Sequence, residues 1–352
     1  MPQNAGMADR LEEYRRRRDA KRTPEPVPER TPEPARAGRA KARFVIQQHH
    51  ARRLHWDLRL EHEGVLASWA VPRGLPREPG RNHLAVHTED HPMEYLTFHG
   101  EIPAGEYGGG RMTIHDTGTY RVEKWRDDEV IVVLDGKRTK GRYALFGTGG
   151  RDWMIRRTDP PPPGWTSMPE LVRPMCPTRA RRLPKDEEAW GYELRWDGVR
   201  AMAYVSGGRL RLLSETDEEI TGTYPWLREL VEELAPTEAV LDGVLVRIDP
   251  AGRVRPATGR RGTSDGQFLI FDLLWLEGVT STDVPYAQRR ELLDGLAFTG
   301  PHWQTPPWFA GVGADALRTA REQGLPGVVA KRLDSPYEPG RRSRRWLSID
   351  TS

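Results

Sequence analysis

Residues 54–61 read LHWDLRLE, a strict alternation of apolar and polar side chains. Because successive side chains of a β-strand point to opposite faces, this pattern predicts a strand with one apolar and one polar face. The polar face carries His55, Asp57 and Arg59, and His49 lies just upstream in QQHHARR. Imidazole and carboxylate groups bind divalent cations, and a guanidinium binds phosphate oxygens. The segment predicts either a metal-assisted phosphoester site or the solvated outer face of an antiparallel sheet, which alternates in the same way.

The composition favours a nucleic-acid partner without proving one. Of the 54 basic residues only seven are lysine, so 54 minus 7 leaves 47 arginines. Arginine has a planar fork that suits phosphate contacts. A bias in the base composition of the genome would give the same excess. The near-neutral net charge of +3 adds no further constraint.

Cysteine usage and the apolar pattern predict the compartment. The single cysteine, Cys176, excludes an internal disulfide and agrees with a reducing environment. Residues 1–18 lack the apolar core of a signal peptide, and the sequence has no run of about 18 apolar residues. We therefore expect a cytoplasmic, nucleoid-associated protein with no membrane partner.

Changes in composition divide the chain, whose 352 residues allow two domains. Residues 1–40 carry two TPEP copies and many charges, which predicts a disordered basic arm with one helical turn near residues 11–18. Residues 41–158 hold short strand-like segments between Gly/Pro turns, which predicts a closed or sandwiched, barrel-like antiparallel β domain. Residues 159–167 include four consecutive prolines and are expected to form a stiff linker.

The remaining residues, 168–352, alternate strand-like with helix-like segments, and the latter are expected at 224–235, 287–296 and 314–323. This alternation predicts an α+β domain. The fold class expected for the whole chain is therefore mainly β plus α+β.

The motifs FVIQQHHARRLHWDLRLE, VLASWAVPRG, LAVHTEDHPMEY and EIPAGEYGGG resemble, in this order, the 3′-phosphoesterase domain of bacterial DNA ligase D. The resemblance implies a divalent metal, most often Mn²⁺, held by His49, His55 and Asp57. It also implies a phosphate-binding role for Arg59. The family's other active-site histidine and its tyrosine match His91 and Tyr95.

Two positions depart from this pattern. The family usually has lysine where this chain has Arg73, and arginine where it has His83. Since histidine has an ordinary pKa near 6.5, His83 is mostly neutral at pH 7 and is a weak substitute for a permanent cation. The arm segment YRRRRDAKRTPEP resembles the family's N-terminal tail motif, which implies roles for Arg18, Asp19 and Glu25.

Residues 168–352 resemble the nucleotidyltransferase domain of ATP-dependent DNA ligases in ELRWDGVR, LDG, FDLL and GVVAKR. Such ligases use a lysine to form a lysyl-AMP, and the matching residue is Arg195, whose delocalised guanidinium is no nucleophile. Five further positions of the family's motifs are also replaced, namely Glu215, Val244, Pro326, Ser348 and Asp350. We expect a pseudo-ligase domain that lacks an OB-fold and does not use ATP.

The combined expectation is metal-dependent healing of DNA 3′ ends, including ends that carry a 3′-ribonucleotide, in bacterial non-homologous end joining. Two alternatives remain open: a non-catalytic scaffold that binds DNA ends, and a working ligase, which Arg195 disfavours. The resemblance implies Ku and a separate polymerase or ligase as partners. Two arginine clusters, 260–261 and 341–345, suit a phosphate backbone or are solvated loops.

Overall fold

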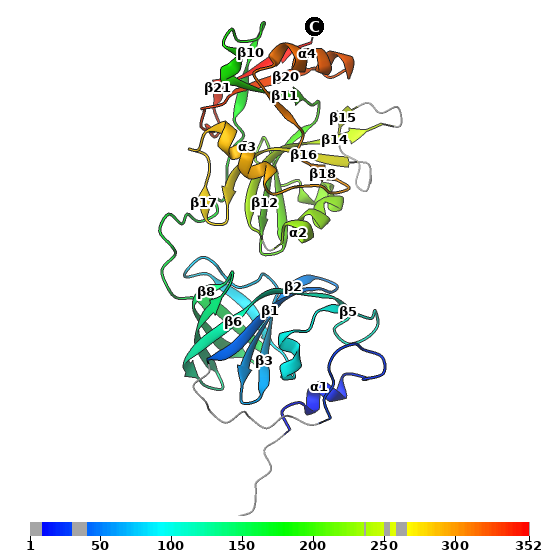
Figure 1. Cartoon of the computed structure of the whole chain (residues 1–352), viewed down its shortest axis with the longest axis vertical. Coiled ribbons are helices and arrows are strands. Elements are labelled where there is room, and N and C mark those ends of the chain that lie inside the picture. Colours follow the sequence, from blue (N-terminus) through cyan, green and yellow to red (C-terminus); the bar gives the residue numbers. More distant parts are fainter. Residues whose placement is uncertain (1–8, 30–40, 236, 250–253, 258–265, 352) are drawn as a thin grey trace, which may run out of the picture. The chain divides into compact units, whose positions relative to one another are not determined.

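The computed structural model describes residues 9–29, 41–235, 237–249, 254–257 and 266–351. The chain forms two compact units, Met1–Pro163 and Gly164–Ser352. The division falls inside the proline-rich segment that the sequence marks as a linker. The expected arginine cluster at 260–261 lies outside the described residues. Each unit is described by itself below (Figure 1).

The first unit is an antiparallel β-barrel. Its nine strands have the order β1-β2-β3-β4-β9-β8-β7-β6-β5, and β1 also pairs with β6, which closes eight strands into a barrel with β5 at its rim. The elements are α1 (Glu12–Arg16), β1 (Ala42–His50), β2 (Leu54–His62), β3 (Val65–Val71), β4 (Asn82–His87), η1 (Met93–Leu96), β5 (Gly100–Ile102), β6 (Gly110–Trp125), β7 (Glu129–Gly136), β8 (Lys140–Gly149) and β9 (Asp152–Arg157). The expectation of a barrel-like β domain is confirmed.

Both faces of the β1–β2 ladder are buried. Leu58 and Leu60 are fully buried on one face, as the alternation predicts. On the other face Asp57 is 6% exposed and Arg59 only 3%. A solvated outer face is therefore excluded for these residues. The polar face is covered because Val45, which pairs with Arg59, packs in one cluster with residues of the arm and of η1.

The N-terminal arm is ordered over its described part, residues 9–29, in contrast to the expectation of disorder. It holds the short helix α1, and Leu11 and Tyr14 on it are fully buried against Tyr95 and Leu96. The helical turn expected near residues 11–18 is present. The described part of the arm is ordered because Leu11, Tyr14 and Val27 pack in one apolar cluster with residues of the barrel and of η1. Residues 1–8 and 30–40 lie outside the described residues.

The described residues of the second unit form two sheets. One has the order β10-β21-β20-β11-β19, and the other has the order β13-β12-β14-β16-β17, with β15 and β18 paired to β14 and β16. The strands are β10 (Cys176–Ala180), β11 (Trp190–Arg195), β12 (Val199–Ser206), β13 (Arg209–Ser214), β14 (Ala239–Ile248), β15 (Val254–Pro256), β16 (Gly266–Leu276), β17 (Val279–Thr280), β18 (Trp303–Gln304), β19 (Trp308–Ala310), β20 (Gly327–Arg332) and β21 (Arg342–Asp350).

Within the described part of this unit, three helices lie where the sequence predicts them: α2 (Arg228–Leu234), α3 (Tyr286–Asp294) and α4 (Gly313–Glu322). Short 3-10 turns are η2 (Glu187–Ala189), η3 (Thr221–Thr223) and η4 (Pro225–Leu227). The α+β expectation is confirmed for this unit. None of the helices in the described part of the chain is long and apolar enough to cross a membrane.

Candidate functional site

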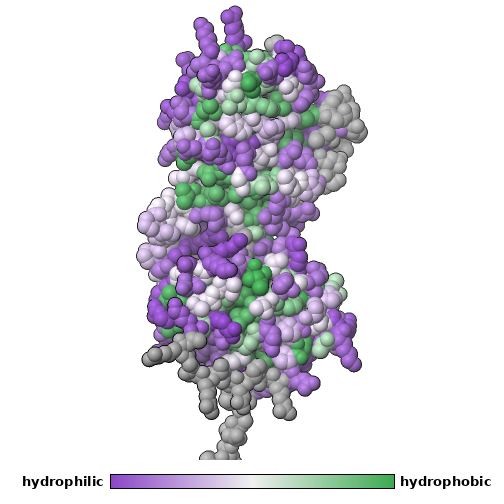
Figure 2. Space-filling model, viewed as in Figure 1, coloured by the Kyte–Doolittle hydropathy of each residue, from purple (hydrophilic) through white to green (hydrophobic). Residues whose placement is uncertain are grey.

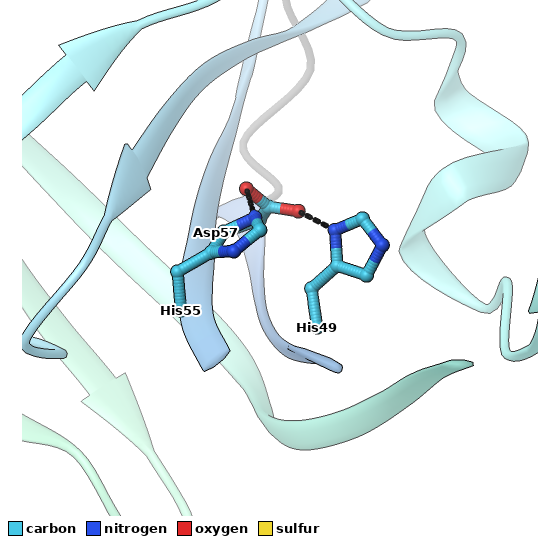
Figure 3. Close-up of side chains that lie close together, drawn as sticks. All are labelled: His49, His55 and Asp57. Atoms are coloured by element: carbon cyan, nitrogen blue, oxygen red, sulfur yellow. Dashed lines mark ion pairs between the residues drawn. The ribbon is translucent and has the colours of Figure 1, made fainter. Parts of the chain in front are cut away.

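Three side chains of the β1–β2 hairpin form a group of metal-binding type (Figure 3). His49 pairs with His55 across the antiparallel ladder, and Asp57 is two residues further along β2, so all three share a face. The Nδ1 atom of His49 lies 3.7 Å from Asp57 Oδ2, and the Nε2 atom of His55 lies 3.7 Å from Asp57 Oδ1. One ligand atom from each residue lies within 4.8 Å of the others. This spacing lets one cation contact all three.

The ring nitrogens of the two histidines are arranged to bind a cation. Burial is the main cause that lowers the pKa of His49, so its imidazole is neutral near pH 7. Its Nε2 atom is buried without a hydrogen-bond partner among the described residues. The Nδ1 atom of His55 lies 2.9 Å from the carbonyl oxygen of Arg53, to which only an N–H can donate. The Nε2 atom of His55 therefore keeps its lone pair on the side of Asp57, and the donor set suits a divalent ion.

Two hydrogen bonds, one to an amide oxygen and one to a carboxylate, hold Arg59 beside this group. Its Nε donates to Gln47 Oε1 over 2.7 Å, and its Nη2 donates to Asp57 Oδ2 over 3.0 Å. Its guanidinium also lies over the Tyr95 ring, 4.8 Å from the centroid. A guanidinium held in this way cannot swing away from the hairpin. It is placed to meet an anionic group bound beside Asp57.

The arm adds charged side chains to the same region. Arg18 donates to Glu25 Oε1 over 2.7 Å and to Glu89 Oε1 over 3.0 Å, and all three side chains are at most 4% exposed. The Tyr95 hydroxyl donates to Glu25 Oε1. Arg18 and Glu25 thus lie in one cluster with Tyr95. Asp19 is not part of this cluster, because it is exposed and closes a turn by accepting from the Lys21 N–H.

His91 lies at the edge of this cluster. Its Nδ1–H donates to the carbonyl of Glu89 over 2.8 Å, and its Nε2 lies 3.4 Å from Arg18 Nη2. Burial, followed by the positive charges of Arg59 and Arg18, lowers the pKa of His91 well below its ordinary value. His91 is therefore a neutral imidazole whose Nε2 accepts a hydrogen bond, which disfavours a role as an imidazolium acid.

Arg73 and His83 flank one turn of the barrel. Arg73 lies two residues beyond the end of β3, in the turn that follows the Trp56–Val71 pair. His83 lies near the start of β4, is 9% exposed, and its Nδ1 is 2.8 Å from the carbonyl oxygen of Gly74. The turn therefore brings the two departing positions together.

Two polar residues of this site, Gln47 and Glu89, are not predicted from the sequence. Gln47 is fully buried, and its amide nitrogen donates to the carbonyls of Tyr95 and Phe98 while its oxygen holds Arg59. Its position two residues before His49 places it on the same strand face, so the alternation could have revealed it. Glu89 binds Arg17 and Arg18 from the arm. That contact spans about 70 residues and leaves no local signal.

In the second unit, four of the six replaced ligase positions meet in one cluster. Arg195 Nη2 donates to the carbonyl of Pro326 over 2.9 Å, its Nη1 donates to the Ser348 hydroxyl, and the same Nη1 lies 2.7 Å from Asp350 Oδ1. The register of β11 on β20 and of β20 on β21 produces this meeting. The other two positions are elsewhere: Glu215 is exposed after β13, and Val244 packs in an apolar cluster with Leu269.

The only lysine of the 164–352 unit besides exposed Lys185 is buried. Lys331 is 1% exposed, its Nζ lies 2.8 Å from Glu193 Oε2, and it sits 4.2 Å from the centroid of the Trp346 ring. Burial is the main cause that lowers its pKa. On β20 Lys331 pairs with Gly191, four residues before Arg195. Its ammonium is thus held by a carboxylate and aromatic rings, away from the Arg195 cluster.

The fold and the two sites define a protein with a phosphoesterase-type β-barrel followed by a nucleotidyltransferase-type domain. Comparison with protein families agrees. Residues 47–147 match the DNA ligase D 3′-phosphoesterase domain, and residues 171–349 match the ATP-dependent DNA ligase domain. The chain therefore belongs to the ATP-dependent DNA ligase domain family and carries a DNA ligase D 3′-phosphoesterase domain in front of it.

Individual relatives give the extent of the match. The multifunctional non-homologous end joining protein LigD of Mycolicibacterium smegmatis is 43% identical over 359 residues, which cover 98% of this chain and 46% of that protein. A probable DNA ligase of Beutenbergia cavernae is 31% identical over 51% of this chain and 38% of its own length. The solved ligase domain of Mycobacterium tuberculosis LigD is 36% identical in sequence and superposes with a TM-score of 0.47. The match covers 51% of this chain and 59% of the solved chain. The chain spans about half the length of the LigD proteins.

Proposed function

We propose that the first unit is a metal-dependent 3′-phosphoesterase that heals the 3′ ends of DNA during non-homologous end joining. The observation that carries this proposal is the His49, His55 and Asp57 group with Arg59 fixed 3.0 Å from the same carboxylate. Two imidazoles and one carboxylate would hold a divalent ion, most often Mn²⁺ in relatives of this kind. The bound ion would polarise the scissile phosphate and lower the pKa of a water molecule.

The reaction would proceed in two hydrolyses. Water first replaces the 5′-oxygen of a 3′-terminal ribonucleoside on phosphorus, which releases the nucleoside and leaves a 3′-phosphate. Water then replaces the 3′-oxygen on phosphorus, which releases inorganic phosphate and leaves a 3′-hydroxyl. In both steps negative charge builds on the phosphoryl oxygens. Arg59 is placed to neutralise that charge, because Gln47 and Asp57 fix the direction of its guanidinium.

His91 and Tyr95 would act by position and hydrogen bonding. The lowered pKa of His91 leaves a neutral imidazole at pH 7, so it would orient Arg18 or a substrate oxygen instead of donating a proton from an imidazolium. The Tyr95 hydroxyl is held by Glu25 and its ring lies against Arg59. The arm would thus complete the site with Arg18 and Glu25, and Asp19 would act only through the turn that it closes.

His83 would make the second hydrolysis more dependent on pH than the first. A 3′-phosphate monoester carries more charge than a diester and needs more neutralisation. Arg73 supplies a permanent charge, whereas a histidine at position 83 carries a charge only when it is protonated, and its Nδ1 lies 2.8 Å from the carbonyl oxygen of Gly74. Removal of the phosphate would therefore be faster when His83 is protonated.

We further propose that the second unit does not seal nicks and does not use ATP. Its nucleophile position holds Arg195, which is engaged by Pro326, Ser348 and Asp350. The unit would instead bind DNA ends, with Ku and a separate polymerase or ligase as partners in the cytoplasm. The ligase alternative predicts covalent transfer of label from α-labelled ATP to the protein, and Arg195 predicts none.

A primer–template that ends in one 3′-ribonucleotide tests the proposal. The 5′-labelled primer is incubated with manganese and the wild-type protein, His55→Ala or Glu61→Gln, and the products are separated on a gel. Glu61 is the matched control, because it lies on the same strand face but pairs with Arg43. We expect shortening to a 3′-phosphate and then a 3′-hydroxyl with wild type and Glu61→Gln, and none with His55→Ala. Absence of shortening with folded, manganese-loaded wild type would leave the scaffold alternative.

A further inference from the structure

The glycine-rich loop between β5 and β6 carries an exposed aromatic side chain, Tyr107, within the motif EIPAGEYGGG. Tyr107 is 44% exposed. Every other phenylalanine, tyrosine and tryptophan in the described part of the first unit is buried or half-buried. In Figure 2 the surface of this unit shows only small hydrophobic patches among hydrophilic side chains. Tyr107 therefore offers a ligand the most accessible aromatic ring on the described surface of the first unit.

This loop packs against the end of β1, the strand that supplies one of the metal-binding histidines. The backbone of Gly108 lies beside the His49 imidazole, whose pKa it acts to raise. A Cβ atom at Gly110 would lie 2.3 Å from the carbonyl oxygen of His50, so the backbones of the loop and of β1 are in direct contact. Backbone hydrogen bonds also close two turns within residues 103–109. The residue before Gly108 is therefore held close to the metal-binding group.

The hydroxyl group of Tyr107 is tied to the arm cluster of the same site. It accepts a hydrogen bond from Arg17 Nη1 and donates to Glu89 Oε2 over 3.4 Å. Glu89 also binds Arg18, whose Nη2 lies 3.4 Å from His91 Nε2. The guanidinium groups of Arg17 and Arg18 lie 4.8 Å and 5.2 Å from the centroid of the Tyr107 ring. The ring thus has a fixed direction and an open surface, so a flat ligand can stack on it at a small cost in side-chain entropy.

A nucleobase is the flat group that the substrate offers to such a ring, a step that rests on the proposed function of the first unit. In the first hydrolysis the scissile phosphate lies at the metal-binding group, and one nucleoside lies beyond it. The base of that nucleoside ends the stack of the primer, so one of its faces has no neighbouring base. Bases further back are covered on both faces by their neighbours. The terminal base is therefore the one that can stack on an aromatic side chain.

We propose that the Tyr107 ring stacks against the base of the 3′-terminal ribonucleoside and positions that nucleoside for release. Tyr107 is then a substrate-positioning residue of the first hydrolysis alone. After that step the 3′-phosphate has no nucleoside beyond it, so Tyr107 has no partner in the second hydrolysis. Because every base has an aromatic face, this contact does not select one base over another.

Two labelled primer–templates, one ending in a 3′-ribonucleoside and one in a 3′-phosphate, test the two hydrolyses separately. Each is incubated with manganese and the full chain as wild type, Tyr107→Ala, Tyr107→Phe or Val122→Ala. Val122 is the matched control, because it is an exposed apolar side chain near the other end of β6. We expect Tyr107→Ala to raise the KM of the first hydrolysis about tenfold, at the lower end of what one stacked base contributes. The KM of the second hydrolysis should not change, and Tyr107→Phe should restore the first because the ring remains.

A second measurement does not depend on turnover. The primer ends in a 2-aminopurine riboside joined through a methylene phosphonate, in which carbon replaces the 5′-oxygen that would leave, and stacking lowers the fluorescence of this base. We expect lower fluorescence with wild type, Tyr107→Phe and Val122→Ala than with Tyr107→Ala. Equal fluorescence with wild type and Tyr107→Ala, or an equal rise of KM in both hydrolyses, would overturn the inference. If wild type quenches the fluorescence through Tyr107 but leaves the cleavable primer intact, the proposed reaction fails and the stacking contact stands.

Discussion

The substitution Arg18→Ala tests whether the arm is a fixed part of the phosphoesterase site. Arg18 joins two buried carboxylates, Glu25 at 2.7 Å and Glu89 at 3.0 Å, and it stacks 3.8 Å from the centroid of the Tyr14 ring. Its removal leaves both carboxylates buried without their shared cation, which costs about 3–5 kcal/mol for a buried pair. We expect the lower end, about 3 kcal/mol, because Glu89 keeps Arg17 and Glu25 keeps Thr23.

A free-energy change of about 3 kcal/mol raises the population of the undocked arm by about 150-fold. Chymotrypsin cleavage after Tyr14 measures that population, since Tyr14 is fully buried in the docked arm. Arg16→Ala is the matched control, because Arg16 is an exposed arginine at the end of α1, two residues before Arg18. Cleavage should accelerate by one to two orders of magnitude with Arg18→Ala, up to the limit of about 150-fold set by the change in population. It should remain unchanged with Arg16→Ala. Equal cleavage of Arg18→Ala and wild type would refute the role assigned to this ion-pair cluster.

Three further outcomes are expected. Asp57→Asn should weaken manganese binding in calorimetry by at least about tenfold, as loss of one charged ligand does, whereas Glu61→Gln should bind as wild type does; unchanged affinity for Asp57→Asn would place the metal elsewhere. Arg195→Lys should not restore label transfer from α-labelled ATP, because Pro326 and Asp350 still stand where the family has glutamate and lysine; a labelled protein band would contradict this. Burial lowers the pKa of His115 from 6.5 to about 4. Below pH 6.5 the unfolded chain binds a proton that the folded chain does not bind, so the free energy of unfolding is highest above pH 6.5 and falls as the pH drops toward 4. The urea midpoint of wild type should therefore drop more between pH 7 and pH 5 than that of His115→Gln, and parallel drops would count against this account.

Local sequence alone predicts the strands and the metal-binding group. The period-two alternation in residues 54–61 determines which side chains share a face of β2, and His49 joins that face because the two strands are consecutive and antiparallel. The motifs in order were enough to identify both domains. Arg195 is likewise visible in the sequence as a replaced lysine.

Other features depend on contacts between distant parts of the chain. The polar face of β2 is buried because the arm and η1 cover it, and composition gives no sign of that cover. Glu89 and Gln47 gain their roles from partners on other elements. Asp19, which the resemblance groups with Arg18 and Glu25, lies outside their cluster, since only the folded arm decides which of its charges face the barrel.

The second unit shows the same division. The sequence determines that six ligase positions are replaced, one by one, and that the arginine at the nucleophile position cannot attack ATP. Only strand register decides that four of these replacements contact each other, while Glu215 and Val244 lie apart. The tertiary structure decides this because residues separated by more than 100 positions meet when β11, β20 and β21 pair, and pairing depends on the whole sheet and not on any one segment.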